Sequence, residues 1–172
     1  MLSNLQTFEP EFEPREINRG YYGIVYRVGE NHAAKVLFKK YLDGTMRFRS
    51  DESSLLNLMG EYEITKTLFE SGVSVPQPFG IFKIPISNMR VPGFVMQYID
   101  GKRAIDLDDP EYNEAMLLAD DQLREAKMLG FDPVDADGKN VLWCPRERKP
   151  YLIDFGSWTS YFSAWEMEWD ER

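Results

Sequence analysis

Acidic and amide side chains border two short apolar runs in the last third of the chain, and their types suit a hard cation. The runs 141–143 and 151–153 are typical of two hairpin strands joined by a turn rich in proline and charge. Asp135, Asp137 and Asn140 precede the first run, and Asp154 follows the second. Because Mg²⁺ usually binds one or two carboxylates together with substrate phosphates, the pattern predicts a magnesium–nucleotide site.

A glycine-containing hairpin and a lysine on the strand after it are the elements that would bind phosphate. Two-residue alternation between residues 16 and 38 predicts the hairpin and a third strand. Gly20 and Gly23 lie at the hairpin turn, where glycine lets backbone N–H groups approach phosphate oxygens, although two such glycines more often mark an ordinary turn. Lys35 lies in a small, apolar strand, so it needs an anionic partner unless the strand is a solvent-facing edge.

Two helices and two further strands complete the predicted framework. A helix at 52–71, capped by Ser50 or Asp51 and ended by Gly72, offers Glu61 and Glu63 as partners for Lys35, or as solvated surface. Its apolar stripe comprises Leu55, Leu58, Met59, Tyr62 and Leu68. We expect strands at 80–84 and 93–99 around a turn at 85–92, a hinge at 100–101, and a helix at 110–129 stopped by Gly130. The buried face of that second helix comprises Ala115, Ala119, Leu123, Ala126 and Leu129.

Composition limits the classes of function. A net charge of −9 in 172 residues argues against non-specific binding to nucleic acid or an anionic membrane. The one cysteine, Cys144, fits a reducing compartment, and residues 1–13 lack signal-peptide features. Residues 1–14 resemble an extended acidic arm, and aromatic residues from Trp158 to Trp169 predict a short amphipathic helix. We therefore expect a cytoplasmic protein without nucleic-acid or membrane partners.

The order of these motifs resembles a protein-kinase-like fold, most closely the small atypical kinases of the RIO and Bud32 type. The shared order is glycine hairpin, strand lysine, helix glutamate, apolar strand and hinge, helix, Asp-x-x-x-x-Asn and Asp-Phe-Gly. Segment 61–76 is similar to the RIO-family helix that ends in Glu-Ala-Gly-Val-Pro-Val-Pro. The resemblance implies an α+β bilobal fold: an N-lobe at 1–99 with a five-stranded antiparallel sheet and one helix, and a very reduced helical C-lobe at 100–172.

The resemblance also implies roles for individual residues in binding ATP and Mg²⁺. Lys35 would hold the α- and β-phosphates with Glu61 as its partner, while Gly20 and Gly23 cover them. Met96 would be the gatekeeper, with backbone groups of Gln97 and Ile99 meeting the adenine. Asp135 would orient or deprotonate the acceptor hydroxyl, and Asn140 and Asp154 would bind the metal. The expected activity is phosphoryl transfer to a protein serine or threonine, autophosphorylation included.

Several departures from the kinase pattern keep other functions open. Asn18 replaces a loop glycine, Pro133 replaces a histidine, and Asp137 adds a negative charge near the transferred phosphate. No activation segment follows Asp-Phe-Gly within these residues. One alternative is a nucleotide-binding regulatory module that recognises a protein partner, for example through the aromatic C-terminal helix. A small-molecule kinase is the other alternative, although the short C-lobe leaves little room for its acceptor pocket.

Overall fold

The computed structural model describes residues 5–160 of the chain, and its internal contacts divide into two compact units. The first unit comprises Met1–Glu63 with Gln77–Tyr98, and the second comprises Ile64–Pro76 with Ile99–Arg172. The predicted α+β class with an antiparallel sheet is confirmed. No helix among residues 5–160 has the length and apolar character needed to cross a membrane.

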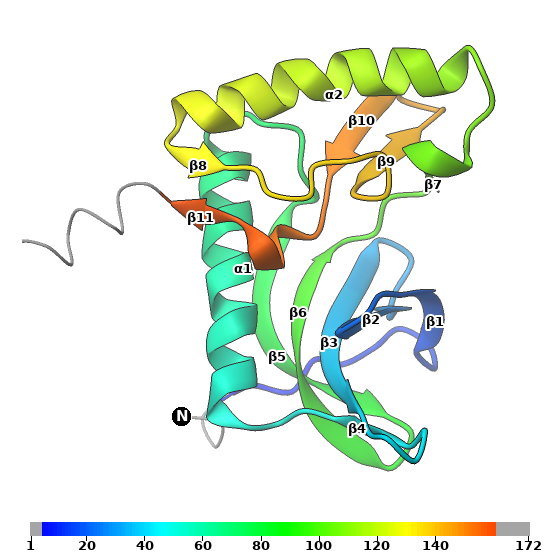
Figure 1. The fold of residues 1–172 in the computed structure, drawn as a ribbon. Coiled ribbons are helices and arrows are strands. Elements are labelled where there is room, and N and C mark those ends of the chain that lie inside the picture. The colour runs from blue at the N-terminus through cyan, green and yellow to red at the C-terminus, as the bar shows by residue number, and fades with distance from the viewer. Residues whose placement is uncertain (1–4, 161–172) are drawn as a thin grey trace, which may run out of the picture. The chain divides into compact units, whose positions relative to one another are not determined.

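An antiparallel sheet of six strands forms the first unit and places Lys35 on a central strand. The strands are β1 (Arg15–Arg19), β2 (Gly23–Arg27), β3 (His32–Lys40), β4 (Met46–Phe48), β5 (Pro78–Ile86) and β6 (Met89–Gln97). Their order is β1-β2-β3-β6-β5, with β4 paired to β3 (Figure 1). The sequence predicted five strands and missed β4. Because β3 pairs with both β2 and β6, the alternative of an edge strand for Lys35 is wrong.

The predicted turn between the last two strands of this sheet is much shorter than expected. Residues 85–92 were predicted as turn, but Pro85 pairs with Arg90 and Pro92 pairs with Lys83. Proline is tolerated in a strand wherever its missing N–H has no ladder partner. Strand β5 ends the sheet, and the pairing of β6 with β3 stops at Gly93, next to Pro92. Both prolines therefore occupy positions where the sheet needs no second hydrogen bond.

Helix α1 (Glu52–Glu70) begins and ends close to where the sequence predicted. The Asp51 side chain accepts a hydrogen bond of 2.9 Å from the Ser54 backbone N–H, which caps the helix. Gly72, at a φ of +87°, follows its end. Leu55, Leu58 and Leu68 are buried as expected, whereas Met59 is 38% exposed. Met59 was predicted to be buried, but the buried face of the helix is narrower than the apolar stripe.

The acidic N-terminal segment lies against the sheet of the first unit. Thr7 forms a β-bridge with Lys83 on β5, and the Phe8 N–H donates to the Lys83 carbonyl at 3.0 Å. A carboxylate oxygen of Glu11 accepts from the Glu30 N–H at 2.6 Å. The segment is therefore attached to both an edge strand and the turn between β2 and β3.

The second unit combines helix α2 with short strands. Its elements are β7 (Lys102–Arg103), η2 (Ala104–Asp106), α2 (Glu111–Met128), β8 (Phe131–Asp132), β9 (Val141–Cys144), β10 (Lys149–Leu152), η3 (Phe155–Ser157) and β11 (Thr159–Ser160). Strands β10, β9 and β7 form one sheet, and β11 pairs with β8 (Figure 1). The predicted hairpin is confirmed as β9 and β10, with Leu152 opposite Val141.

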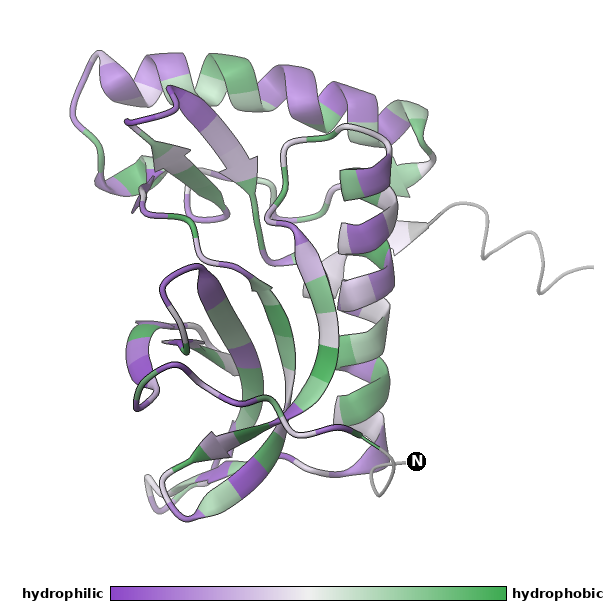
Figure 2. Ribbon diagram, turned by 180° about the vertical axis from the view of Figure 1, so that it is seen from behind, coloured by the Kyte–Doolittle hydropathy of each residue, from purple (hydrophilic) through white to green (hydrophobic). Residues whose placement is uncertain are grey.

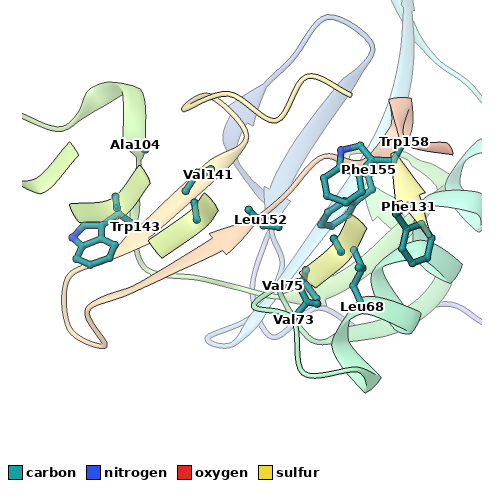
Figure 3. Packing of buried hydrophobic residues seen from close by; sticks show 13 residues of the cluster. Leu68, Val73, Val75, Ala104, Phe131, Val141, Trp143, Leu152, Phe155 and Trp158 are labelled. Atoms are coloured by element: carbon teal, nitrogen blue, oxygen red, sulfur yellow. The ribbon is translucent and has the colours of Figure 1, made fainter. Parts of the chain in front are cut away.

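A large apolar core lies within the second unit. Hydrophobic and hydrophilic residues alternate along α2 (Figure 2), and Ala115, Ala119 and Ala126 are buried as predicted. Figure 3 shows Phe155 and Trp158 close to Phe131 in this core, and the Phe155 and Trp158 rings meet edge to face at 4.8 Å.

The predicted aromatic C-terminal helix is only partly covered by the described residues. Trp158 follows η3, and Thr159–Ser160 form strand β11. The prediction of a helix is therefore wrong for residues 158–160. The remainder of the predicted helix, residues 161–172, lies outside the residues that the structure describes.

Candidate functional site

Lys35 and Glu61 form a buried ion pair within the first unit. The Lys35 Nζ lies 2.7 Å from Glu61 Oε1 and 2.8 Å from Oε2. The Lys35 side chain is 12% exposed and that of Glu61 is 5% exposed. Burying either charge alone would be costly, so each side chain holds the other in a fixed position. The predicted partnership is therefore present, and the alternative partner, Glu63, is exposed.

The packing of α1 against the sheet explains why Glu61 reaches the lysine. Leu58 and Tyr62 lie three residues before and one residue after Glu61, and both join Leu37 and Phe94 in one apolar cluster. The Tyr62 and Phe94 rings meet at 5.9 Å, edge to face. Phe94 is also opposite Lys35 in the pairing of β3 with β6. The same contacts thus place the glutamate beside the lysine.

Of the two loop glycines, only Gly23 is under a close steric demand. The Gly20 N–H donates to the Gly23 carbonyl at 2.8 Å, which makes the loop tight. A Cβ on Gly23 would lie 3.1 Å from Lys35 Cε and 3.4 Å from the Val36 carbonyl oxygen, whereas a Cβ on Gly20 would meet nothing closer than 3.7 Å. Gly23 is therefore the glycine that lets the loop lie directly against the Lys35 side chain.

The residues predicted to meet adenine lie on either side of the division between the units. Met96, on β6 in the first unit, packs with Leu37 and Phe94. The Gln97 N–H donates to the Gln77 carbonyl at 2.8 Å, so this donor is already used within the sheet. Ile99 belongs to the second unit and is buried, and its carbonyl accepts from the Gly101 N–H.

Two aspartates of the second unit adopt left-handed backbone conformations. Asp135 has a φ of +58° and Asp154 a φ of +64°. Such values are uncommon for residues with a Cβ, and they persist where the surrounding structure enforces them, often at functional sites. Aspartate tolerates the conformation better than most residue types. The two predicted catalytic and metal-binding carboxylates are thus both held in strained backbone.

Asn140 connects the loop that contains Asp135 to the strand that leads to Asp154. Its side-chain Nδ2 donates to the Asp135 carbonyl at 2.8 Å, and its own carbonyl accepts from the Ile153 N–H at 2.9 Å. Because the amide nitrogen is used in the loop, the oxygen Oδ1 is the atom that could bind a cation. These bonds bring the three predicted residues of the second unit into one neighbourhood.

Asp137, the extra acidic residue of the loop, has a counter-charge that sequence reasoning missed. Its carboxylate accepts from the Lys139 N–H at 2.9 Å and lies 3.3 Å from the Lys139 ammonium. The backbone hydrogen bond, followed by the side-chain interaction, lowers the pKa of Asp137. The signal was in the sequence, because Lys139 lies two residues after Asp137. The ion pair offsets part of the negative charge that Asp137 adds.

The donor set of the second unit suits magnesium better than a dense metal centre. Among residues 5–160 no group of three or more His, Cys, Asp or Glu side chains is arranged to hold a metal ion. Asn140 and Asp154 supply one amide oxygen and one carboxylate, a small set of the kind Mg²⁺ uses together with water and substrate phosphates. The residues present therefore fit this ion only as part of a nucleotide complex.

Comparison with known proteins supports the predicted fold. No family model and no curated protein sequence matches the chain. Among solved structures, the chain is similar to the Rio2 kinase–ADP/Mg²⁺–phosphoaspartate complex from Chaetomium thermophilum, with a TM-score of 0.61 and 19% sequence identity. The match covers 87% of this chain and 49% of the Rio2 chain, so the chain spans about half of that protein's length. The protein thus has a protein-kinase-like fold, as its motifs predicted.

Proposed function

We propose that the protein is an ATP- and Mg²⁺-dependent phosphotransferase that acts on serine or threonine residues of a protein substrate, itself included. The observation that carries the proposal is the bidentate Lys35–Glu61 ion pair, buried on a central strand of a RIO-type fold. A structural role alone gives little reason to bury an ammonium in an apolar sheet, because an apolar pair of similar volume would be as stable. Binding of polyphosphate gives such a reason.

In the first unit, Lys35 would bind the α- and β-phosphates, since Glu61 holds its ammonium in place. Gly20 and Gly23 would cover the phosphates with backbone N–H groups, and Gly23 has the close approach to Lys35 that this role requires. Met96 would border the adenine. Because the Gln97 N–H is already bonded, its carbonyl would face adenine together with the backbone of Ile99.

In the second unit, Asn140 and Asp154 would hold Mg²⁺, which supplies neutralisation of phosphate charge when bound. Asp135 would accept the proton of the attacking hydroxyl and orient it. The hydrogen bond from Asn140 to the Asp135 carbonyl supports this assignment, because it couples the position of the base to that of a metal ligand. Phosphoryl transfer depends on alignment and charge stabilisation, which these few groups can supply.

A nucleotide-binding regulatory module is the second candidate, and Pro133 and Asp137 favour it. A second acceptor class is suggested by the Rio2 structure, which contains a phosphoaspartate. In this chain an aspartate carboxylate could likewise accept the phosphoryl group. Whichever of these functions the protein has, we propose that it works in a reducing compartment such as the cytoplasm. The free, buried Cys144 supports this location.

Transfer of label from γ-labelled ATP tests these candidates. We expect label on protein only with Mg²⁺, a loss of roughly 10²- to 10⁴-fold in Asp135→Asn, and retained nucleotide binding in that variant. Asp120→Asn, an exposed carboxylate on α2, is the matched control and keeps full activity. Label released by hydroxylamine identifies an acyl phosphate in place of a serine or threonine ester. Binding of Mg–ATP without transfer supports the regulatory module, and full activity in Asp135→Asn contradicts the assignment.

A further inference from the structure

The hairpin of β3 and β4 carries an exposed group of cations that form no ion pair with the acidic residues of the described part of the chain. We call Lys39, Lys40, Tyr41 and Arg47 the β3–β4 patch; all four are exposed. Within residues 5–160, no carboxylate oxygen lies within 4.0 Å of the three cations. Asp43, the acidic residue in the hairpin turn, is bonded to Thr45 instead.

Two of these cations face each other across the strand pair. Lys39 is directly opposite Arg47 in the register, where like charges destabilise an antiparallel pair. Both lie over the ring of Tyr41, with Lys39 Nζ at 5.4 Å and Arg47 Cζ at 5.5 Å from its centre. A bound anion would relieve this repulsion, so the arrangement favours an acidic ligand.

The geometry of β4 adds a second requirement, namely an extended ligand with an apolar side. Among the described strands β4 pairs only with β3, so its outer edge can accept another strand. Side chains alternate between faces along a strand, so Met46 and Phe48 lie on the face opposite to Arg47. Met46 is 45% exposed, and Leu42 in the turn is fully exposed. The edge thus presents Lys39 and Arg47 on one face. On the other face it presents Met46 beside Lys40, which is opposite it in the register, and the Arg19 guanidinium lies 3.0 Å from the Met46 sulfur.

The chain's own sequence contains a segment with the complementary pattern. In residues 165–171 the acidic Glu166, Glu168 and Asp170 alternate with Trp165, Met167 and Trp169. We propose that the β3–β4 patch binds segment 165–171 of a second copy of the chain in an extended conformation, in place of the helix that the aromatic spacing predicts for these residues. The carboxylates would face Lys39 and Arg47, and the apolar side chains would cover Met46 and Leu42. This contact does not depend on phosphoryl transfer.

An anionic lipid surface fits the patch less well. Among the apolar side chains of the β3–β4 hairpin, only Leu42 is fully exposed, and cations lie over the Tyr41 ring. Little apolar surface of the hairpin could therefore insert into a bilayer. The net charge of −9 would also repel an anionic membrane, against which three cations provide weak attraction.

Fluorescence anisotropy of a labelled peptide of residues 161–172 tests the contact directly. The receptor is the full chain with Glu166→Gln, Glu168→Gln and Asp170→Asn, so that its own segment does not compete. We expect binding that weakens about tenfold in Lys39→Glu/Arg47→Glu and falls with salt. Lys102→Glu/Lys127→Glu changes the charge equally at exposed positions elsewhere and leaves binding within about twofold. The milder Lys39→Gln/Arg47→Gln, checked by thermal unfolding, guards against a folding defect.

Sedimentation of the full chain tests whether a second copy supplies the segment. We expect the unmodified chain to self-associate as its concentration rises. Lys39→Glu/Arg47→Glu on its own, and Glu166→Gln/Glu168→Gln/Asp170→Asn on its own, should each remain monomeric. Mixing the two variants restores association, because one retains the segment and the other retains the patch. The proposal is overturned if the unmodified chain is monomeric at all concentrations, or if the patch substitutions do not change the affinity for the peptide. Patch-dependent binding to phosphatidylserine vesicles without self-association would overturn it in favour of a lipid.

Discussion

Lys35 Nζ, on a strand, contacts both carboxylate oxygens of Glu61, on a helix, at 2.7 and 2.8 Å, and the two residues are 26 positions apart in the sequence. Both side chains are nearly buried. The stability of the fold therefore depends on both charges being present, whatever ligand the lysine binds. A buried ion pair contributes little net stability compared with an apolar pair, but a half-broken one is costly.

Removing one member of this ion pair should destabilise the protein more than removing both. We expect Glu61→Ala to lower the free energy of unfolding by about 3 kcal/mol, because it leaves a buried ammonium unpaired. The double variant Lys35→Met/Glu61→Met should recover most of that loss. Glu70→Ala, an exposed glutamate of α1, serves as the control, with an effect within about 0.5 kcal/mol. Urea unfolding measures all four proteins, and a double variant as unstable as Glu61→Ala would contradict the argument.

The left-handed backbone at Asp154 predicts an unusual order of stability among its variants. Asp154→Gly and Asp154→Ala both lose the carboxylate, but only glycine adopts a φ of +64° without a steric cost. We expect Asp154→Gly to be more stable than Asp154→Ala by about 1 kcal/mol. At Asp120, inside helix α2, we expect the opposite order, with Asp120→Ala more stable than Asp120→Gly by about 1 kcal/mol. Equal stability of the two Asp154 variants in urea would show that the backbone there relaxes at no cost.

Local signals explain which elements could be predicted from the sequence. Helix α2 has Pro110 before it, Gly130 after it and buried alanines at helical spacing, so its bounds were predicted within about two residues. Strand β4 has three residues and depends on pairing with β3, which no local pattern reveals. Pro85 and Pro92 were predicted as turn because proline usually interrupts a strand. Whether it does depends on which N–H groups the sheet uses, and the sequence does not show this.

The candidate site was predictable in residue type but less so in geometry. The resemblance to RIO kinases selected Glu61 over Glu63, and the burial of α1 agrees with that choice. The positive φ values of Asp135 and Asp154 are uncommon for residues other than glycine, and no sequence neighbour indicated them. The use of the Gln97 N–H by Gln77 depends on contact between residues 20 apart, which the sequence alone could not show.

Acid should weaken the start of helix α1 through Asp51. The Arg49 guanidinium, then the Ser54 hydroxyl and N–H, hold the pKa of the Asp51 carboxyl well below its ordinary value of 3.8. A lowered folded-state pKa gives stability that is complete above the ordinary value and is lost as the pH falls toward the folded one. We therefore expect the urea midpoint of Asp51→Asn to fall less steeply than that of the unmodified chain between about pH 4 and pH 2.

Arg49→Gln tests the cause of this pH dependence. It removes the largest interaction of Asp51 and keeps the carboxylate, so its midpoint should decline with a slope between those of the unmodified chain and Asp51→Asn. Parallel curves for the three proteins would place the acid sensitivity in other carboxylates.

If the protein transfers phosphate, Lys139 should act by neutralising Asp137. The two side chains are 3.3 Å apart and half exposed, so their interaction is modest and sensitive to salt. We expect Lys139→Gln to lower the transfer rate by up to about fivefold, because it leaves the Asp137 charge near the transferred phosphate. Asp137→Asn in the same chain should restore the rate, and the deficit of Lys139→Gln should shrink at high ionic strength. Lys127→Gln, on α2, is the matched control. A deficit that persists in the double variant and in high salt would mean that Lys139 acts through the shape of the loop and not through its charge.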